Sequence, residues 1–268
     1  RGDKSMKAEE IKKAVRKSYG KIAKSKNACS CWHPSSCCGA GGSRTPGDTS
    51  ANLGYSMEEI AKAPEGANMG LGCGNPQAIA SLQVGETVVD LGSGGGFDCL
   101  LAVQSVGENG QVIGVDMTPE MISKARENAA KGGYGNGDFR LGDIENLPVS
   151  ENSVDVVISN CVINLSTDKE KAYREAFRVL RSGGRLAIMD IVVTAELPVE
   201  IREDISLYTG CVAGAQQIDN LKQIIEKAGF KDISIRPRDE SREMIREWVP
   251  GSKLDDYIVS ASIEAKKP

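Results

Sequence analysis

Strands and helices alternate through the middle of the chain, and this order constrains the fold more than any other feature. Short apolar runs typical of strands occupy residues 86–92, 111–117, 138–143, 153–160 and 185–191. Runs typical of helices occupy residues 97–107, 119–132 and 169–180, and we expect Gly183 and Gly184 to end the last one. Apolar strands joined by helices form parallel sheets that are covered on both faces. The sequence therefore predicts an α/β fold with a doubly wound, largely parallel sheet.

The segments before this core differ in character. Residues 7–24 carry apolar side chains at helical spacing and predict an amphipathic helix. Residues 27–54 are small, polar and rich in glycine and cysteine, which predicts a loop. A short helix is expected to begin after Ser56 and to stop at Pro64.

The segments after the core complete the same pattern. Residues 218–229 predict a helix, and residues 232–237 and 257–265 predict strands. The segment 194–217 interrupts the alternation and contains Cys211. Because it follows the carboxyl end of a strand, we expect it to lie where open α/β sheets bind ligands.

A glycine-rich turn directly follows the first predicted strand. The sequence VVDLGSGGG places Gly92, Gly94 and Gly96 in this turn and Asp90 two residues before it. Glycines allow a ligand to approach the backbone at a tight strand-to-helix turn. The GxGxG spacing differs from the GxGxxG of dinucleotide sites. An acid beside the turn would repel a pyrophosphate but attract the ammonium group of S-adenosylmethionine (SAM).

Two further acids follow the next strands. Asp116 ends the second expected strand, where it is placed to accept hydrogen bonds from ribose hydroxyls. Asp143 follows the third strand, where it is placed to bond an adenine amino group. Because the carboxyl ends of parallel strands meet at one edge, the acids should face the same ligand. We predict a SAM site, with a nicotinamide site or a fold without cofactor as the alternative.

Composition excludes several classes of partner. The formal net charge is −4 and aromatic residues make up 4%, so neither a broad basic face nor a stacking platform for nucleic acid is expected. No apolar run approaches the ~20 residues of a membrane helix. The charged N-terminal residues lack the apolar core of a signal peptide. We expect a cytoplasmic monomer that binds neither nucleic acid nor membranes.

Eight cysteines and a single histidine point to thiol chemistry. In a reducing cytoplasm, cysteines serve metals, metalloids or redox reactions more often than structural disulfides. Oxygen and nitrogen acceptors of a methyl group usually need a base, whereas trivalent arsenic held by soft thiolates already carries a lone pair. Cys161 follows the fourth strand and is the thiol best placed beside the cofactor.

A family resemblance agrees with this chemistry. The motifs GLGCGNP, DLGSGGGFDC, GVDMTPEMI, SNCVINL and TGCVAGA together resemble those of microbial arsenite methyltransferases. The resemblance runs from the helix VRKSYGKIA to the last strand. It implies a class I SAM-dependent methyltransferase that methylates thiol-bound As(III), with Cys73, Cys161 and Cys211 as the arsenic ligands. The residues then expected to bind SAM are Asp90, Gly92, Gly94, Gly96, Asp116, Met117, Asp143, Ile144 and Asn160.

The same resemblance implies a redox cycle. Methyl transfer leaves arsenic formally pentavalent, and a pair of cysteines reduces it while forming a disulfide. Thioredoxin or a small thiol then restores the enzyme, and no metal ion is expected to take part. A leader cysteine is implied as the partner of Cys73; the SSCCG context favours Cys38, with Cys37 as the alternative.

These expectations divide the chain into three parts. They are a helix with a cysteine-rich leader at 1–68, a SAM-binding α/β domain at 69–193, and an As(III)-binding segment that also completes the sheet at 194–268.

Several alternatives stay open. One is a small-molecule C- or O-methyltransferase with incidental cysteines, and another is a metalloid-binding protein on the same fold without enzymatic activity. The leader cluster CSCWHPSSCC, which includes His33, could bind zinc, although it lacks the usual C-x2-C pairs. Cys99 is expected to pack against the sheet, and Tyr19 either packs in the same way or covers SAM.

Overall fold

The computed structural model describes residues 2–25, 45–249 and 251–268. The strands are β1 (Thr87–Leu91), β2 (Gln111–Asp116), β3 (Gly137–Leu141), β4 (Val154–Asn160), β5 (Leu180–Val193), β6 (Gln216–Gln217), β7 (Lys231–Arg238) and β8 (Ile258–Lys266). They form one sheet in the order β3-β2-β1-β4-β5-β8-β7, with β6 paired to β5 outside this path. β8 runs antiparallel to both β5 and β7, whereas the other pairs are parallel.

Helices flank this sheet and extend beyond it. They are α1 (Gly2–Lys24), α2 (Pro46–Asn52), α3 (Met57–Lys62), α4 (Gln77–Ala80), α5 (Phe97–Val106), α6 (Pro119–Gly132), α7 (Lys169–Val179), α8 (Val199–Arg202), α9 (Ile205–Thr209), α10 (Ile218–Lys227) and α11 (Ser241–Trp248), with 3-10 turns η1 (Ile163–Leu165) and η2 (Leu254–Asp256). Among the described residues, none of the helices combines the length and apolar character that crossing a membrane requires.

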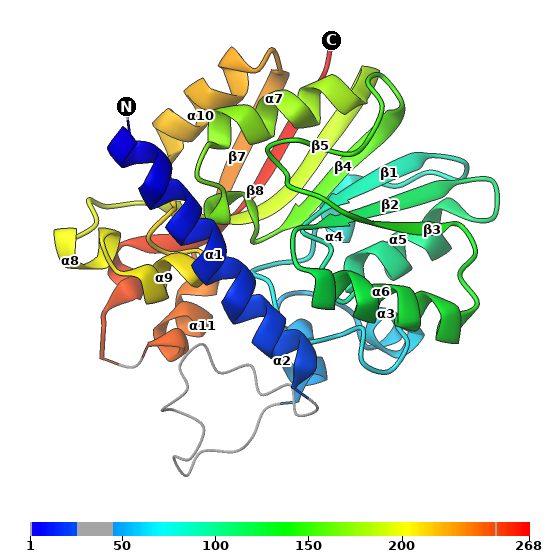
Figure 1. The fold of residues 1–268 in the computed structure, drawn as a ribbon, viewed down its shortest axis with the longest axis horizontal. Helices are drawn as coiled ribbons and strands as arrows, with labels where there is room; N and C mark the ends of the chain where they lie inside the picture. Colours follow the sequence, from blue (N-terminus) through cyan, green and yellow to red (C-terminus); the bar gives the residue numbers. More distant parts are fainter. Residues whose placement is uncertain (1, 26–44, 250) are drawn as a thin grey trace.

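The sheet has an apolar core on each face. α5 and α6 cover one face, and α7 and α10 cover the other (Figure 1). In β1 the consecutive residues Val88 and Val89 belong to the two different cores, because successive side chains of a strand point to opposite faces. The doubly wound, mainly parallel α/β fold predicted from the sequence is therefore confirmed.

A third apolar cluster lies beyond the ends of the strands. It joins Val15 of α1 to residues of β5, α11 and the segment after α9, and it contains Cys73, Cys161 and Cys211. This cluster places three separated thiols in one region of the molecule.

Part of the segment expected to be a loop is helical. The Thr45 hydroxyl accepts a hydrogen bond from the Asp48 N–H at 3.2 Å, and the Asp48 carboxylate accepts one from the Thr45 N–H at 2.9 Å. This capping box, with Pro46 in the first turn, starts α2. The prediction of a loop is wrong for residues 46–52, because local capping signals outweigh the small-residue composition.

The end of α7 also differs from the prediction. Leu180 caps this helix and is already paired with Val154 as the first residue of β5. Gly183 and Gly184 lie inside β5, where the register with β4 shifts and Gly183 has a φ of 79°. The glycine pair therefore permits an irregularity in a strand and does not end the helix.

The sequence did not predict α11. Its apolar residues Met244, Ile245 and Trp248 pack on the third cluster, but the helix has only eight residues, fewer than the window over which helical periodicity is read.

Candidate active site

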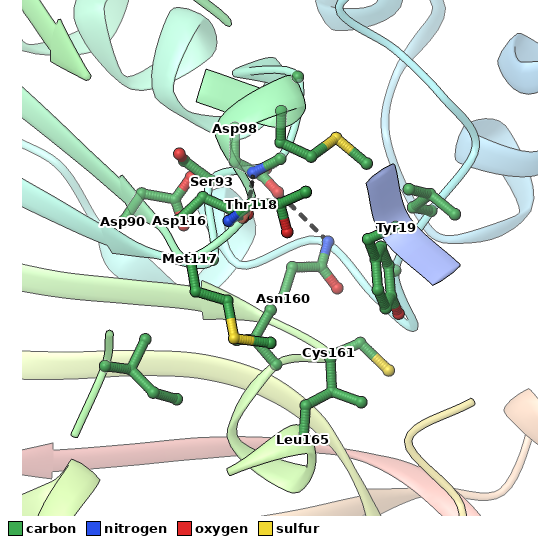
Figure 2. Close-up of a pocket in the computed structure, with 18 of the residues that line it drawn as sticks. Tyr19, Asp90, Ser93, Asp98, Asp116, Met117, Thr118, Asn160, Cys161 and Leu165 are labelled. Carbon is green, nitrogen blue, oxygen red and sulfur yellow. Dashed lines mark hydrogen bonds between the residues drawn. The ribbon is translucent and has the colours of Figure 1, made fainter. Parts of the chain in front are cut away.

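A pocket lies beside α1 at the carboxyl ends of β1, β2 and β4 (Figure 2). Its empty space, counted together with its open mouth, is about 1140 Å³. Its walls come from α1, the turn after β1, the ends of β2 and β3, and the segment after β4. Open α/β sheets bind their ligands at this edge.

The turn after β1 requires its glycines. Gly92, Gly94 and Gly96 have φ values of 72°, 51° and 90°, in the left-handed region that other residues disfavour. A Cβ atom on Gly92 would lie 2.4 Å from Val162, whereas one on Gly94 would meet nothing within 4 Å. The buried Ser93 hydroxyl lines the pocket and has no hydrogen-bond partner among the described residues. The turn thus presents backbone and hydroxyl groups to a ligand.

Two buried carboxyl groups line the pocket from β1 and α5. Asp90 accepts a hydrogen bond from the Cys99 thiol at 3.2 Å, and burial together with the neighbouring Asp98 raises its pKa well above the usual range. Asp98 accepts hydrogen bonds from the Tyr55 hydroxyl at 2.7 Å and the Asn160 amide at 3.3 Å. Burial raises the pKa of Asp98 to about 6. The rise is limited because these hydrogen bonds offset part of the desolvation. Asp98 is therefore ionised at neutral pH.

Two more acids lie farther along the pocket. Asp116 accepts hydrogen bonds from the Gly94 N–H at 3.0 Å and the Thr118 N–H at 2.8 Å, and burial raises its pKa. Asp143 accepts one from the Lys12 ammonium group at 2.7 Å. Both positions agree with the strand-end acids that the sequence predicted.

The pocket fits SAM. Its acids suit the ammonium, ribose and adenine amino groups, and the open glycine turn and the unpartnered Ser93 hydroxyl offer further polar contacts. The predicted cofactor residues that line it are Asp90, Gly92, Gly94, Asp116, Met117, Asp143, Ile144 and Asn160. Gly96 stands behind the turn as the N-cap of α5.

Three cysteines that are far apart in the sequence meet next to this pocket. Cys73, Cys161 and Cys211 are all buried in the same cluster. The Cys211 thiol donates a hydrogen bond to the Cys161 carbonyl at 2.7 Å. Hydrogen bonds with the Cys211 and Cys73 sulfurs, together with burial, raise the pKa of Cys161 well above its usual range. Cys161 also lines the cofactor pocket, so the two sites adjoin (Figure 2).

Asn160 and Ser260 hold the Cys73 loop in place. The Asn160 side chain accepts a hydrogen bond from the Cys73 N–H at 3.0 Å and donates one to the Gly74 carbonyl at 2.8 Å. The Ser260 hydroxyl donates to the Cys73 carbonyl at 2.6 Å. Because Asn160 directly precedes Cys161, its side chain fixes the Cys73 loop beside Cys161.

The backbone at two of these cysteines is unusual. Cys161 and Cys211 have φ values of 61° and 59°, a region that costs a non-glycine residue about 1–3 kcal/mol. The Cys161 N–H donates to the Met189 carbonyl at 2.7 Å, and the Cys211 N–H to the Tyr208 carbonyl at 3.0 Å. The surrounding contacts therefore hold both thiols in conformations that an isolated chain would avoid.

A buried carboxyl group accompanies the thiols. An oxygen of Asp190 and the sulfurs of Cys73 and Cys161 lie within 4.8 Å of one another. Asp190 accepts a hydrogen bond from the Asn164 amide at 2.9 Å, and burial raises its pKa to about 7. Burial also lowers the pKa of the nearby Lys169 to about 8. The thiols thus lie near two buried polar groups, the Asp190 carboxyl and the Lys169 amine.

The structure describes some of the cysteines named by the sequence predictions and not others. Cys99 packs in the core between α5 and the sheet, as predicted. Cys37, Cys38 and the rest of the cluster around His33 lie outside the described residues. Sequence reasoning missed four residues that belong to the site, although one of them, Asp98, lies inside the quoted motif DLGSGGGFDC. They are Lys12, Asp98, Lys169 and Asp190.

Comparison with known proteins places the chain among methyltransferases. Residues 82–229 match a family model described as a methyltransferase domain. The chain is 51% identical over 263 residues to the arsenite methyltransferase of Halobacterium salinarum, covering 97% of this chain and 67% of that protein. It is 40% identical over 176 residues to the arsenite methyltransferase of Aquipseudomonas alcaligenes, covering 63% of this chain and 50% of that protein. The chain thus spans about two thirds of the first relative and half of the second.

A solved structure shows the same likeness. The arsenic(III) S-adenosylmethionine methyltransferase from Chlamydomonas reinhardtii superposes with a TM-score of 0.62 and 33% sequence identity. The superposition covers 83% of this chain and 74% of that one.

Proposed function

The chain belongs to the SAM-dependent arsenite methyltransferase family, and we propose that it transfers methyl groups from SAM to As(III) bound by Cys73, Cys161 and Cys211. One observation carries the assignment of these residues: three buried thiols converge beside a pocket that fits SAM. The chain spans only part of the length of its relatives, so the activity of the whole protein belongs to this proposal.

Arsenic binding needs no base from the protein. As each thiol of the three cysteines forms an arsenic–sulfur bond, its proton leaves with one hydroxyl group of arsenous acid as water. Arsenic stays trivalent, and this soft metalloid binds sulfur ligands in preference to hard oxygen donors. Burial of the three sulfurs keeps competing water away from the product of this exchange.

Methyl transfer then depends on placement. SAM supplies an electrophilic methyl group, and the arsenic lone pair is the nucleophile. Cys161, which lines the pocket and belongs to the thiol cluster, holds arsenic next to the methyl donor. Because the lone pair is already available, neither a general base nor a metal ion is needed.

The acids of the pocket orient the cofactor. Asp98, ionised at neutral pH, and Asp90 face its ammonium group. Asp116 accepts hydrogen bonds from the ribose hydroxyls. Asp143, which the Lys12 ammonium group holds by a hydrogen bond, accepts a hydrogen bond from the adenine amino group. Met117 and Ile144 supply apolar walls.

Reduction completes the cycle. Methyl transfer leaves arsenic pentavalent. The thiol of a leader cysteine, Cys38 or else Cys37, then attacks the arsenic-bound sulfur of Cys73 and releases its proton. The bond between Cys73 and arsenic breaks, its electron pair returns arsenic to the trivalent state, and the two sulfurs join as a disulfide. Cys37 and Cys38 both lie outside the described residues. Thioredoxin or a small thiol then reduces the disulfide.

The proposal also includes the location, the oligomeric state and the role of each part of the chain. The protein acts as a cytoplasmic monomer, with 69–193 holding SAM and 194–268 contributing to arsenic binding. The leader at 1–68 supplies the redox partner of Cys73.

The test is a product assay with matched cysteine variants. The protein is incubated with SAM, arsenite, a thiol reductant and a metal chelator, and arsenic species are identified by mass. Cys161→Ser and Cys211→Ser should each lower methylation by more than about 100-fold, because one arsenic–sulfur bond is lost, while SAM still binds. Cys99→Ser, an equally buried thiol outside the cluster, should retain activity.

Three outcomes would count against the proposal. Full activity of either active-site variant would exclude the thiol ligands, and loss of activity with the chelator would show that a metal is required. Without the reductant, turnover should stop after about one methyl group per protein; sustained turnover would exclude the cysteine redox step.

A further inference from the structure

The face of α1 that lines the pocket connects the cofactor site to the thiols. Lys12, Val15 and Tyr19 follow one another at helical spacing, and all three line the pocket. Lys12 reaches the acids at one end, 2.7 Å from Asp143 and 2.6 Å from Glu145. Tyr19 stands at the other end, beside Cys161 (Figure 2).

The Tyr19 side chain contacts the segment that carries the third thiol. Its hydroxyl donates a hydrogen bond to the Thr209 carbonyl at 3.3 Å, and burial together with the nearby Cys211 thiol raises the pKa of Tyr19. Its ring packs on the apolar cluster that contains the three cysteines. The hydrogen bond of this hydroxyl thus ends on the backbone two residues before Cys211.

That segment depends on outside contacts. α9 is a short helix of five residues without a buried side chain. Cys211, two residues beyond it, has a φ of 59°, a conformation that persists only when its surroundings hold it. The Cys211 thiol donates to the Cys161 carbonyl, and the Tyr19 hydroxyl holds the backbone two residues before it, so the two bonds together limit where the sulfur can move.

We propose that Tyr19 is a positioning residue whose hydroxyl holds α9 and Cys211 against the cofactor pocket, so that the third thiol meets arsenic beside the methyl donor. This role rests on the proposed function, because it assumes that Cys211 binds arsenic. It differs from simple packing, since packing needs only the ring of Tyr19.

The test separates the hydroxyl from the ring. Tyr19→Phe keeps the ring, and Tyr134→Phe removes a distant hydroxyl bonded to Gln104 and the Lys62 carbonyl as a matched control. The dissociation constant of arsenite is measured by equilibrium dialysis and that of SAM by calorimetry. For Tyr19→Phe we expect arsenite to bind about tenfold more weakly, as for one lost hydrogen bond. SAM affinity should stay within about twofold, and the arsenite concentration at half-maximal rate should rise in parallel.

Amide hydrogen exchange gives a second readout that needs neither ligand. Exchange across residues 205–211 should quicken about tenfold in Tyr19→Phe, because the segment loses its anchor, and should not change in Tyr134→Phe. Unchanged arsenite affinity and unchanged exchange in Tyr19→Phe would overturn the proposal. Weaker SAM binding with normal arsenite binding would overturn it as well, because Tyr19 would then belong to the cofactor site alone.

The outcomes also separate this role from the proposed function. Dialysis and exchange require no turnover. A wild-type protein that binds arsenite without methylating it would refute the proposed function and leave the positioning role intact if Tyr19→Phe still weakens binding. A wild-type protein that binds no arsenite would refute both.

Discussion

Burial raises the pKa of two carboxyl groups in the cofactor pocket, and the groups that donate hydrogen bonds to them differ. Asp90 has a thiol as its hydrogen-bond donor, whereas Asp98 has a tyrosine hydroxyl and an amide. The stronger donors stabilise the carboxylate of Asp98 and hold its pKa at about 6 despite full burial. Asp98 therefore carries the negative charge that a cationic cofactor needs near neutral pH.

SAM binding should consequently depend on pH through Asp98. The pKa of this group is raised to about 6, so the carboxylate is present above pH 7 and is lost as the pH falls below 6. Apparent SAM affinity, measured by calorimetry between pH 5 and pH 8, should be constant above pH 7. It should fall by about tenfold at pH 5, because the group must first release its proton.

Asp98→Asn should bind SAM more weakly and without this pH dependence. The exposed Asp219→Asn is the control and should behave as the wild type does. An Asp98→Asn variant with the wild-type pH profile would show that Asp98 does not face the cofactor.

Residue identity alone predicted only part of this chemistry. Asp90 stands at a fixed distance from the glycine turn, so the sequence marks it. Asp98 and Asp190 are ordinary acids of a helix and a strand in the sequence. Their roles depend on the donors around them and on burial, which only the folded chain defines.

Ion pairs join α1 to the acids beside the cofactor pocket. The Lys12 ammonium group bridges Asp143 and Glu145 at 2.7 and 2.6 Å. Burial lowers the pKa of Lys12, but the hydrogen bonds to the two acids outweigh this effect and raise it. Glu145 in turn accepts a hydrogen bond from the Ser166 hydroxyl, so the ion pairs of Lys12 connect α1 to the loop after β4.

Lys12→Met should therefore weaken the attachment of α1. We expect a loss of about 2 kcal/mol in the free energy of unfolding, between the values for exposed and fully buried pairs. Urea unfolding at low and high salt measures it, and the loss should shrink at high salt. Lys13→Met on the exposed side of the same helix is the control; equal stability of the two variants would contradict a role for the bridge.

Elements were predictable where periodicity and caps agree. The sequence placed the helix at 119–132 correctly, with Thr118 before it and the left-handed Gly133 after it. It failed for α2, whose capping box lies in a glycine-rich stretch, and for α11, whose apolar face spans only eight residues. Long helices with an apolar face are therefore easier to predict than short ones.

At the scale of the whole molecule, strand order explains where the chemistry gathers. The chain passes from β3 across the sheet to β4, so β1 and β4 are neighbours whose connections leave in opposite directions. The crevice at this point holds the glycine turn of β1 and Cys161 after β4, as expected for doubly wound sheets. This part of the site follows from topology.

The other two thiols do not follow from topology. Cys73 is fixed by Asn160 from β4 and by Ser260 from the antiparallel strand β8, 187 residues along the chain. Cys211 depends on a segment outside the sheet. The sequence resemblance named both residues, but how they reach the pocket could only be learned from tertiary packing.

X-ray absorption at the arsenic edge tests the central claim most directly. With one equivalent of arsenite bound to the reduced protein, the account predicts three sulfur neighbours and no oxygen neighbour around arsenic. Cys211→Ser should reduce the number of sulfur neighbours to two, and Cys99→Ser should leave three. Oxygen neighbours in the wild-type spectrum, or three sulfurs in Cys211→Ser, would contradict the claim that Cys73, Cys161 and Cys211 hold As(III) beside the methyl donor.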